Sequence, residues 1–395
     1  MISSRAQPSR PVVSESRAER MALLANLLRK HGPMTRSQLS VLSGLAKSSI
    51  AELVSDMVDD EKVLLRGHDQ SGRGRGRPAE TVVLNPAAGA AIGLDFGFRH
   101  VRAVIADVSH TVLASDETKL EVDYTPEAGL AAAASLVRAL IESTGTRAER
   151  LLGLAAGIPG PIDAWTGLVT RSSMVPKWVD VPVSTELERT TGFPVTIDND
   201  ANLAAYGERL WGAARGYDNV LYFKLHSGVG GALIINGSIA GGARGGAGEF
   251  GHMIVNPDGP LCRCGNRGCL EVYAGIPAVL SAAEVRGSNR PTLSSLLRLA
   301  EEGDRASQRV IADAAMRVGA GAAILCNAIN PDAIIVGGSL SAAGQPLLAE
   351  IRRAIDVGAL PINGGVIVSA GELGKQATAL GAVGRVLAQA PLAGL

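Results

Sequence analysis

One histidine and three cysteines lie close together in the sequence and have side chains that bind transition metals. Cys262, Cys264 and Cys269 fall within eight residues, and His252 comes ten residues before the first of them. One imidazole and three thiolates complete a tetrahedral zinc site with no open position, as in structural rather than catalytic zinc sites. In a cytosolic chain such a cluster indicates metal binding rather than disulfide bonds. The sequence therefore predicts one structural Zn²⁺ ion.

A second segment has the composition of a DNA contact. Arginine alternates with glycine in SGRGRGRP, Ser71–Pro78, which puts Arg73, Arg75 and Arg77 at every second position. The segment has no apolar side chain to bury, and arginine is attracted to the narrow, negative minor groove of A/T-rich DNA. The alternative is a flexible linker with solubilising charge.

Three helices and two strands are expected to position this segment. Apolar residues at helical spacing predict helices over Arg17–Lys30, Arg36–Ser43 and Lys47–Asp60. In the second helix Leu39 and Leu42 are expected to face inward, and Gly44 makes the turn to the third. Strands are expected at Val63–Leu65 and Thr81–Leu84, on either side of the arginine segment. This order is typical of a winged helix-turn-helix.

The start of the third helix is the part that enters the major groove in this layout. Its outward residues, and so the candidate DNA contacts, are Lys47, Ser48, Ser49 and Glu52. An ordinary solvated helix face is the alternative for this segment alone. The helix together with the cationic wing predicts binding to a double-stranded DNA operator.

Charge is distributed unevenly along the 395 residues, although the net charge is zero. Residues 1–84 hold 13 Lys/Arg against 9 Asp/Glu, which leaves 25 against 29 for the rest. A basic head on an acidic body favours local contact with DNA. There is neither a long apolar run nor a start like a signal peptide, so we expect a cytoplasmic protein without a membrane segment.

The chain beyond Ala90 alternates strands with helices, which predicts an α/β domain. Two glycine-bearing turns follow strands, DFGF at Asp95 and HSGVGG at His226, and they indicate a duplicated core. We expect a disordered tail at 1–16, the DNA-binding domain at 17–86 and an α/β domain at 87–395.

From about Ala88 to its end the sequence resembles the ROK family, named for repressors, open reading frames and sugar kinases. The N-terminal module resembles that of the family's repressor branch. The resemblance is carried by GIPGP (Gly157–Pro161), DNDAN (Asp198–Asn202), GEFGHM (Gly248–Met253) and CRCGNRGCLE (Cys262–Glu271). It implies a two-lobed, actin-like fold, with one lobe at about 90–197 plus the C-terminal helix and the other at about 198–375. It also implies a homodimer or homotetramer.

The resemblance further implies a sugar site between the lobes. Its residues would be Asn199, Asp200, Glu249, His252 and Glu271, whose side chains can donate to and accept from sugar hydroxyls. His252 would serve twice, with one ring nitrogen on zinc and the other on a hydroxyl. In ROK kinases the counterpart of Asp200 is the general base.

The phosphate loops of ROK kinases are altered in this sequence. The kinase pattern D-x-G-G-T is replaced by Asp95-Phe-Gly-Phe-Arg, so that Phe98 and Arg99 stand at the last two positions. The pattern G-T-G-x-G-G loses its first glycine to His226. We therefore predict a sugar-responsive repressor without efficient phosphorylation. The alternative is an ATP-dependent hexose kinase with an accessory DNA-binding domain; Arg99 also leaves a sugar-phosphate effector open.

Overall fold

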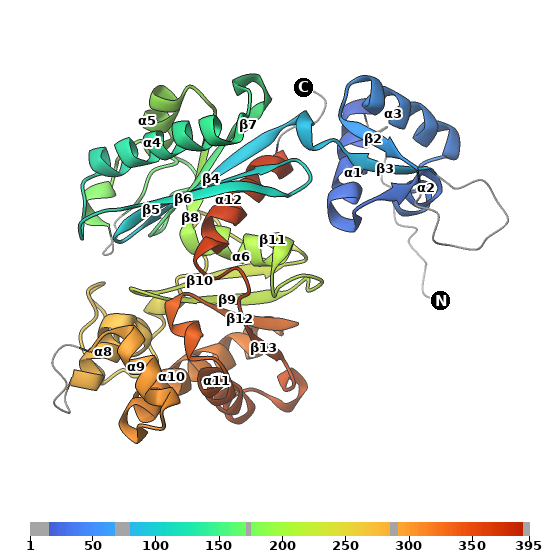
Figure 1. Ribbon diagram of the computed structural model, residues 1–395. Helices are drawn as coiled ribbons and strands as arrows, with labels where there is room; N and C mark the ends of the chain where they lie inside the picture. The colour runs from blue at the N-terminus through green and yellow to red at the C-terminus, as the bar shows by residue number, and fades with distance from the viewer. Residues whose placement is uncertain (1–15, 68–79, 171–174, 285–290, 390–395) are drawn as a thin grey trace, which may run out of the picture. The chain divides into compact units, whose positions relative to one another are not determined.

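The computed structural model describes residues 16–67, 80–170, 175–284 and 291–389 (Figure 1). The chain forms two compact units. The first contains the chain up to Gly89, together with Val108–His110 and the end of the chain from Ala388. The second contains Ala90–Asp107 and Thr111–Leu387. Each unit has its own sheets and its own core.

The first unit is built from three helices and a three-stranded antiparallel sheet of order β1-β3-β2. Its elements are α1 (Arg17–His31), β1 (Met34–Thr35), α2 (Arg36–Ser43), α3 (Lys47–Asp59), β2 (Val63–Arg66) and β3 (Thr81–Leu84). Capping boxes begin α1 at Ser16 and α2 at Thr35, and Gly44 ends α2 in the left-handed conformation. The three predicted helices and two predicted strands are confirmed, whereas β1 was not predicted because it is only two residues long.

The core of this unit confirms one expected position on α2 and corrects another. Leu39 is fully buried, as are Leu24, Ile50 and Met57 on the neighbouring helices. The expectation that Leu42 faces inward is wrong, since this residue is 50% exposed. Three residues along a helix turn the side chain about 60° away from its starting direction, and a helix as short as α2 buries only a narrow stripe.

The second unit contains two five-stranded mixed sheets of the same design. One has the order β6-β5-β4-β7-β8 and the other β11-β10-β9-β12-β13. In each sheet the central strand (β4 or β9) pairs antiparallel with the next strand of the chain and parallel with a later one. This repetition confirms the duplicated core that the two glycine turns predict.

The strands of the first sheet are β4 (Ala90–Gly97), β5 (His100–Asp107), β6 (Val112–Lys119), β7 (Leu151–Ile158) and β8 (Val195–Asn199). Those of the second are β9 (Val220–Leu225), β10 (Val229–Ile235), β11 (Ser238–Ile239), β12 (Ala333–Gly337) and β13 (Ile367–Ala370). The helices are α4 (Pro126–Thr144), α5 (Val183–Thr191), α6 (Asp200–Trp211), α7 (Glu271–Ala274), α8 (Ile276–Glu284), α9 (Leu293–Glu301), α10 (Arg305–Ile329), α11 (Gln345–Gly358) and α12 (Ala377–Gln389).

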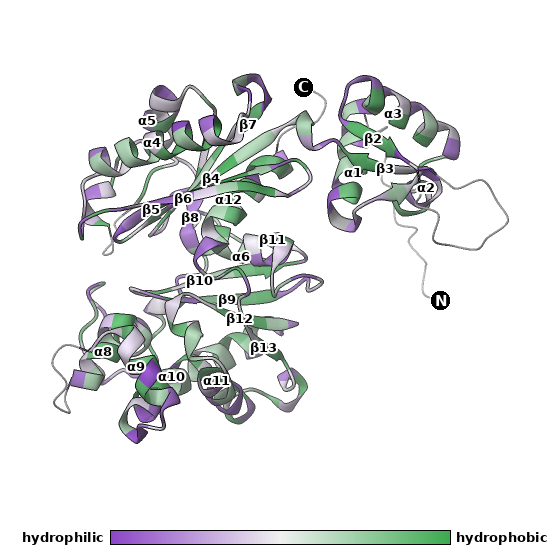
Figure 2. Cartoon of the chain, in the orientation of Figure 1, coloured by the Kyte–Doolittle hydropathy of each residue, from purple (hydrophilic) through white to green (hydrophobic). Residues whose placement is uncertain are grey.

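Helices cover the sheets in layers (Figure 1). α4 and α5 share a core with the first sheet, and α7 to α11 share one with the second. α6 and α12 lie between the two sheets, where small alanine side chains pack against β9, β10 and β12. Figure 2 shows hydrophobic colour along β9 and β12, in keeping with the burial of their side chains.

One described helix, α10, is long and apolar enough to cross a membrane. Half of its apolar window is buried within the structure, where it packs beside α11. Core helices pass the same test of length and hydropathy, so this is weak evidence for a membrane segment.

Close approach between α12 and the first sheet depends on glycine. A Cβ at Gly93 on β4 would lie 1.9 Å from the carbonyl oxygen of Ala379. A Cβ at Gly381 on α12 would similarly lie 1.7 Å from the carbonyl oxygen of Leu203 on α6. The absence of these side chains lets helix and strand backbones touch, which fixes how far apart the two sheets lie.

Replacing Gly93 by alanine tests this packing. Helix and strand must separate to admit the methyl group, so we expect a loss of about 1–3 kcal/mol in the free energy of unfolding. Gly246→Ala is the control, because a Cβ there would have open space around it. Urea unfolding followed by circular dichroism would contradict the argument if both variants had the wild-type midpoint.

Candidate functional site

A cleft of about 1220 Å³ opens between the two sheets of the second unit. Its walls come from the turns that follow β4, β7 and β9, from the start of α6 and from the segment that leads into α12. Small-molecule sites usually have about 300–1000 Å³, so the cleft has room for more than one monosaccharide. All five side chains that were assigned to a sugar, namely Asn199, Asp200, Glu249, His252 and Glu271, line it.

Asn199 is already engaged in holding the cleft together. Its Oδ1 accepts hydrogen bonds from the backbone N–H groups of Ala201 and Asn202 at 2.8 and 3.2 Å, which makes it the N-cap of α6. Its Nδ2 donates to the carbonyl oxygen of Gly160 at 3.0 Å. Asn199 therefore ties the DNDAN segment to the GIPGP turn and has one N–H left for a ligand.

Glu271 at the start of α7 is buried and paired. Its Oε1 accepts from Nε of Arg263 at 2.9 Å, and its Oε2 accepts from the backbone N–H of Val229 at 3.3 Å. A Cβ at Gly228 would lie 2.3 Å from this carboxylate, so only glycine lets the β9–β10 turn come so near. These contacts fix the carboxylate at the wall of the cleft.

Glu249 and His252 are the polar groups most available to a ligand. Within the described residues the Glu249 carboxylate makes no hydrogen bond, and it forms an ion pair with His252, whose Nε2 lies 4.0 Å away. Burial raises the pKa of Glu249, and the nearby charges of Asp200 and Glu271 act in the same direction, against the effect of His252. A sugar hydroxyl would supply the hydrogen bond that this carboxylate lacks.

The four residues assigned to a metal lie together. Their ligand atoms are all within 4.8 Å of one another. Sγ of Cys262 is 3.8 Å from Nδ1 of His252, and Sγ of Cys264 is 3.7 Å from Sγ of Cys269. Ligands bound to one tetrahedral zinc at about 2.3 Å are separated by nearly 4 Å, so the donor set and its spacing fit this metal.

Local backbone geometry brings the cluster together. Short β-bridges join Ile254 to Cys269 and Leu261 to Arg267. Gly268 has φ +64°, and a Cβ there would lie 1.5 Å from the carbonyl oxygen of Asn256. The turn requires glycine here, because it combines a positive φ with a close approach of two backbone segments.

His252 belongs to both groups of residues. Its Nδ1 faces the cysteines and its Nε2 faces Glu249 and the cleft. With Nδ1 on a metal, the neutral ring would carry its proton on Nε2 and donate it toward the cleft. A metal at this cluster would therefore set the tautomer of the histidine.

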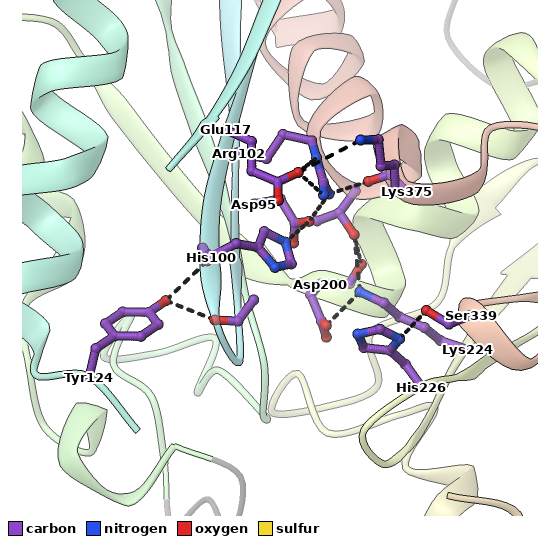
Figure 3. Close-up of polar contacts among 12 residues, drawn as sticks. Asp95, His100, Arg102, Glu117, Tyr124, Asp200, Lys224, His226, Ser339 and Lys375 are labelled. Carbon is purple, nitrogen blue, oxygen red and sulfur yellow. Dashed lines mark hydrogen bonds and ion pairs between the residues drawn. The ribbon is translucent and has the colours of Figure 1, made fainter. Parts of the chain in front are cut away.

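The other side of the cleft is a network of paired charges (Figure 3). Oδ2 of Asp95 accepts from Nη1 of Arg102 at 3.1 Å and lies 3.3 Å from Nε2 of His100. Nη2 of Arg102 donates to Glu117 at 2.6 Å, and Nη1 also donates to the carbonyl oxygen of Lys375. Burial opposes the charge of Asp95, but His100, Lys224 and Arg102 together hold its pKa below the ordinary value.

The altered phosphate loops are also placed in this region. Phe98 lines the cleft, whereas Arg99 is exposed and is not among the lining residues. Nδ1 of His226 lies 2.7 Å from Oγ of Ser339, and burial with the nearby charge of Lys224 lowers the pKa of His226. An aromatic ring and a hydrogen-bonded imidazole thus occupy positions that are small in the kinase pattern.

Lys224, near the end of β9, was not identified from the sequence. Its Nζ donates to Oδ2 of Asp200 at 2.6 Å and to Oγ1 of Thr378 at 3.1 Å, and Figure 3 shows Lys224 and Asp200 pointing toward each other. A single lysine within the apolar strand VLYFKL was the available signal, because a charge there must have a partner inside the protein.

The model of the ROK family matches residues 91–389. The chain belongs to the ROK family. The xylose repressor of Bacillus spizizenii is 30% identical over 91% of this chain and 92% of its own length. A glucokinase of Halalkalibacterium halodurans is 36% identical over 58% of this chain and 74% of its own.

A solved structure shares the fold over almost the whole chain. It is a ROK family transcriptional regulator described as a homologue of the E. coli MLC protein, with a TM-score of 0.80 at 24% identity. The match covers 95% of this chain and 98% of the other. The predicted fold class, a winged helix-turn-helix followed by a two-lobed ROK domain, is confirmed.

The described residues among those assigned to DNA lie in the first unit of this ROK protein. Lys47, Ser48 and Glu52 are exposed in the first turns of α3, and Ser49 is half-buried. Arg73, Arg75 and Arg77 lie outside the described residues. Three of the four α3 side chains assigned to DNA are therefore exposed to a ligand.

The paired charge of Asp95 has a measurable effect on stability. Because its pKa is lower in the folded chain, the carboxylate stabilises the fold above its unfolded pKa, and this stabilisation is lost as pH falls through the folded pKa. We expect Asp95→Asn to lower the free energy of unfolding at neutral pH by about 1.5–3 kcal/mol, the contribution of a hydrogen bond to a charged group. The loss is no larger because Arg102 still has Glu117 as a partner in the variant.

Chemical unfolding at neutral and at acid pH checks this expectation. The deficit of Asp95→Asn should shrink as the pH is lowered, because the wild-type carboxylate then becomes neutral as well. Asp356→Asn, at an exposed position of α11, is the matched control and should unfold like wild type. A deficit that is unchanged by acid would contradict the electrostatic explanation.

Proposed function

We propose that this chain is a sugar-responsive, DNA-binding transcriptional repressor that does not phosphorylate its sugar efficiently. One observation carries the proposal: the cleft brings together the five side chains assigned to a sugar, and its carboxylates Asp95 and Asp200 are already paired with Arg102 and Lys224. Phosphoryl transfer depends on positioning and neutralising a nucleotide, and Phe98 and His226 stand where that would happen. The names of relatives such as the xylose repressor support the same function.

The proposed effector is a monosaccharide held by Glu249, His252, Asp200, Glu271 and the free N–H of Asn199. These groups offer acceptors and donors in fixed directions, as a hydroxyl-rich ligand requires. Xylose is the first sugar to test because the repressor relative is named for it, and glucose is the second because of the glucokinase relative.

The proposed DNA-binding domain is residues 17–86. Lys47, Ser48, Ser49 and Glu52 would contact the major groove, and Arg73, Arg75 and Arg77 the adjacent minor groove. Two such domains, in a homodimer or a homotetramer in the cytoplasm, would read the two half-sites of an operator. Residues 87–395 would form the sugar-sensing domain, with its lobes divided near residue 198.

Sugar would act by favouring one arrangement of the two lobes. A ligand shifts a conformational equilibrium only as far as its affinities for the two states differ. The five proposed sugar residues follow residue 198, and the turn Pro159–Pro161 of the other lobe lines the same cleft. A sugar that also contacts this turn would bind most tightly when the lobes are closed around it. The spacing of the two DNA-binding domains would change with this closure.

The proposed cofactor is one structural zinc ion on His252, Cys262, Cys264 and Cys269. The ion would hold the loop after Met253 in place and fix the orientation of His252. His252 would then present Nε2 to the sugar.

Glu249→Gln tests the proposed sugar site. The substitution removes an acceptor whose charge strengthens its hydrogen bond, so we expect sugar affinity to fall about ten- to a hundredfold. Calorimetry with xylose and glucose measures the loss, and anisotropy of labelled promoter DNA measures operator release by sugar. Glu284→Gln, at an exposed position of α8, is the control. Equal sugar affinity for both variants would contradict the assignment.

A coupled assay for ADP release separates the repressor from the alternative enzyme. With the sugar that binds and with Mg-ATP, wild type is expected to release little or no ADP in response to sugar. Robust sugar-dependent release would instead favour an ATP-dependent hexose kinase with an accessory DNA-binding domain.

Cys264→Ser tests the metal. Wild-type protein purified without chelator should contain about one zinc per chain, and the variant should lose it because serine is a poor zinc ligand. The variant should also unfold at a lower temperature and bind sugar more weakly, since His252 loses its anchor. Cys326→Ser changes a buried cysteine of α10 outside the cluster and should keep the zinc. Metal analysis that finds no zinc in wild type would refute the proposal.

A further inference from the structure

The ammonium group of Lys224 lies in the cleft against a carboxylate that the sugar site and a phosphoryl-transfer site would both need. Its Nζ is 2.6 Å from Oδ2 of Asp200, and each side chain is only 17% exposed. We propose that Lys224 is a specificity-determining residue whose ammonium supplies the positive charge that a divalent cation would bring, so that the cleft binds sugar without metal or nucleotide. This inference rests on the proposed function and explains how that function excludes the kinase reaction.

Three separate elements hold this charge in place. Lys224 comes from β9, Asp200 from the start of α6, and Thr378 from the first turn of α12. Oγ1 of Thr378 accepts from Nζ of Lys224 at 3.1 Å and donates to the carbonyl oxygen of Asp200 at 3.1 Å. The lysine is therefore oriented by the hydroxyl as well as by the carboxylate, and its place does not depend on a ligand.

The neighbouring carboxylate also has an internal cation. Asp95 accepts from Arg102 at 3.1 Å, and Lys224 adds its own field to that of the arginine. Burial works against the charge on Lys224, but Asp200 and Asp95 keep its pKa above the ordinary value. Lys224 is therefore charged at neutral pH, and Asp95 and Asp200 are neutralised by groups of the protein.

A divalent cation has no favourable place beside these charges. Magnesium in phosphoryl-transfer sites is held by one or two carboxylates together with phosphate oxygens and water. Asp200 and Asp95 are carboxylates of that kind, but an ion between them would stand next to an ammonium group and a guanidinium group. Repulsion between like charges in a partly buried site is strong. A neutral sugar hydroxyl, in contrast, can accept a hydrogen bond from the third N–H of Lys224, which Asp200 and Thr378 leave free, and can donate one to Asp200.

Removal of the ammonium group should expose a latent cation site. We expect Lys224→Met to bind Mn²⁺ at least about tenfold more tightly than wild type, because Asp200 then lacks a counter-charge. Full-length, zinc-loaded protein is titrated with Mn²⁺, and the electron paramagnetic resonance signal of free Mn²⁺ reports binding. Lys224→Arg, which keeps the charge, should behave like wild type, and adding Asp200→Asn to Lys224→Met should abolish the gain.

Lys375→Met provides the matched control. Lys375 also lines the cleft, but its side chain is 76% exposed and its ammonium lies 3.9 Å from Glu117. It should gain no Mn²⁺ binding. A folded Lys224→Met that binds Mn²⁺ no better than wild type, or an equal gain in Lys375→Met, would overturn the inference.

A second measurement applies even if Lys224→Met does not fold. In Asp200→Asn, Lys224 loses its ion pair, so its amine should be deprotonated more easily and should react faster with an acylating reagent at mildly alkaline pH. Peptide mass spectrometry gives the labelling of Lys224 relative to other lysines. Unchanged labelling would overturn the inference without touching the proposed function, whose own failure would appear as sugar-dependent ADP release by wild type.

Discussion

Charge compensation inside a partly buried cleft is the constraint on which the rest of this structure depends. The cleft contains four carboxylates, and each lies against a basic side chain. The pairs are Asp95 with Arg102, Asp200 with Lys224, Glu249 with His252, and Glu271 with Arg263. An unpaired charge in such surroundings would be costly, so the strands and turns must bring both members of each pair to the same wall. The strength of pairing differs among the four, and the most loosely held carboxylate, Glu249, is the one best placed to accept a hydrogen bond from a ligand.

The backbone meets this requirement through close packing around α6 and α12. Gly93 and Gly381 let a strand and two helices approach until backbone atoms touch. α6 then begins at Asp200 and α12 at Ala377, which brings Asp200 and Thr378 within hydrogen-bond reach of Lys224. A change of side-chain size on these helices would therefore act on the charges of the cleft as well as on stability.

Sequence patterns predicted the parts of this protein that depend on local signals. Helical periodicity and the turn at Gly44 predicted the three helices of the first unit, and the glycine turns at Asp95 and His226 predicted the duplicated sheets. The His252 and cysteine spacing predicted a cluster that the structure brings within 4.8 Å. The side chains assigned to a sugar were named from motifs, and the structure brings them all to one cleft.

Features that depend on distant parts of the chain were missed. Lys224 meets Thr378 from a segment more than 150 residues away, and Arg102 reaches the carbonyl oxygen of Lys375. Periodicity cannot show such partners, because they depend on how the two sheets face each other. The same limit explains Leu42, whose apolar character predicted burial although α2 turns it to solvent. A charged residue inside an apolar strand nevertheless indicates that a partner of opposite charge lies elsewhere in the fold.

Cys264 places the metal cluster at the wall of the cleft. This cysteine is exposed and lines the cleft, whereas Cys262 and Cys269 are buried behind it. An ion held by the cluster would thus lie beside the space proposed for a sugar. A bound sugar would then slow the removal of the metal by a chelator. The rate of metal removal would therefore report how long the sugar stays bound.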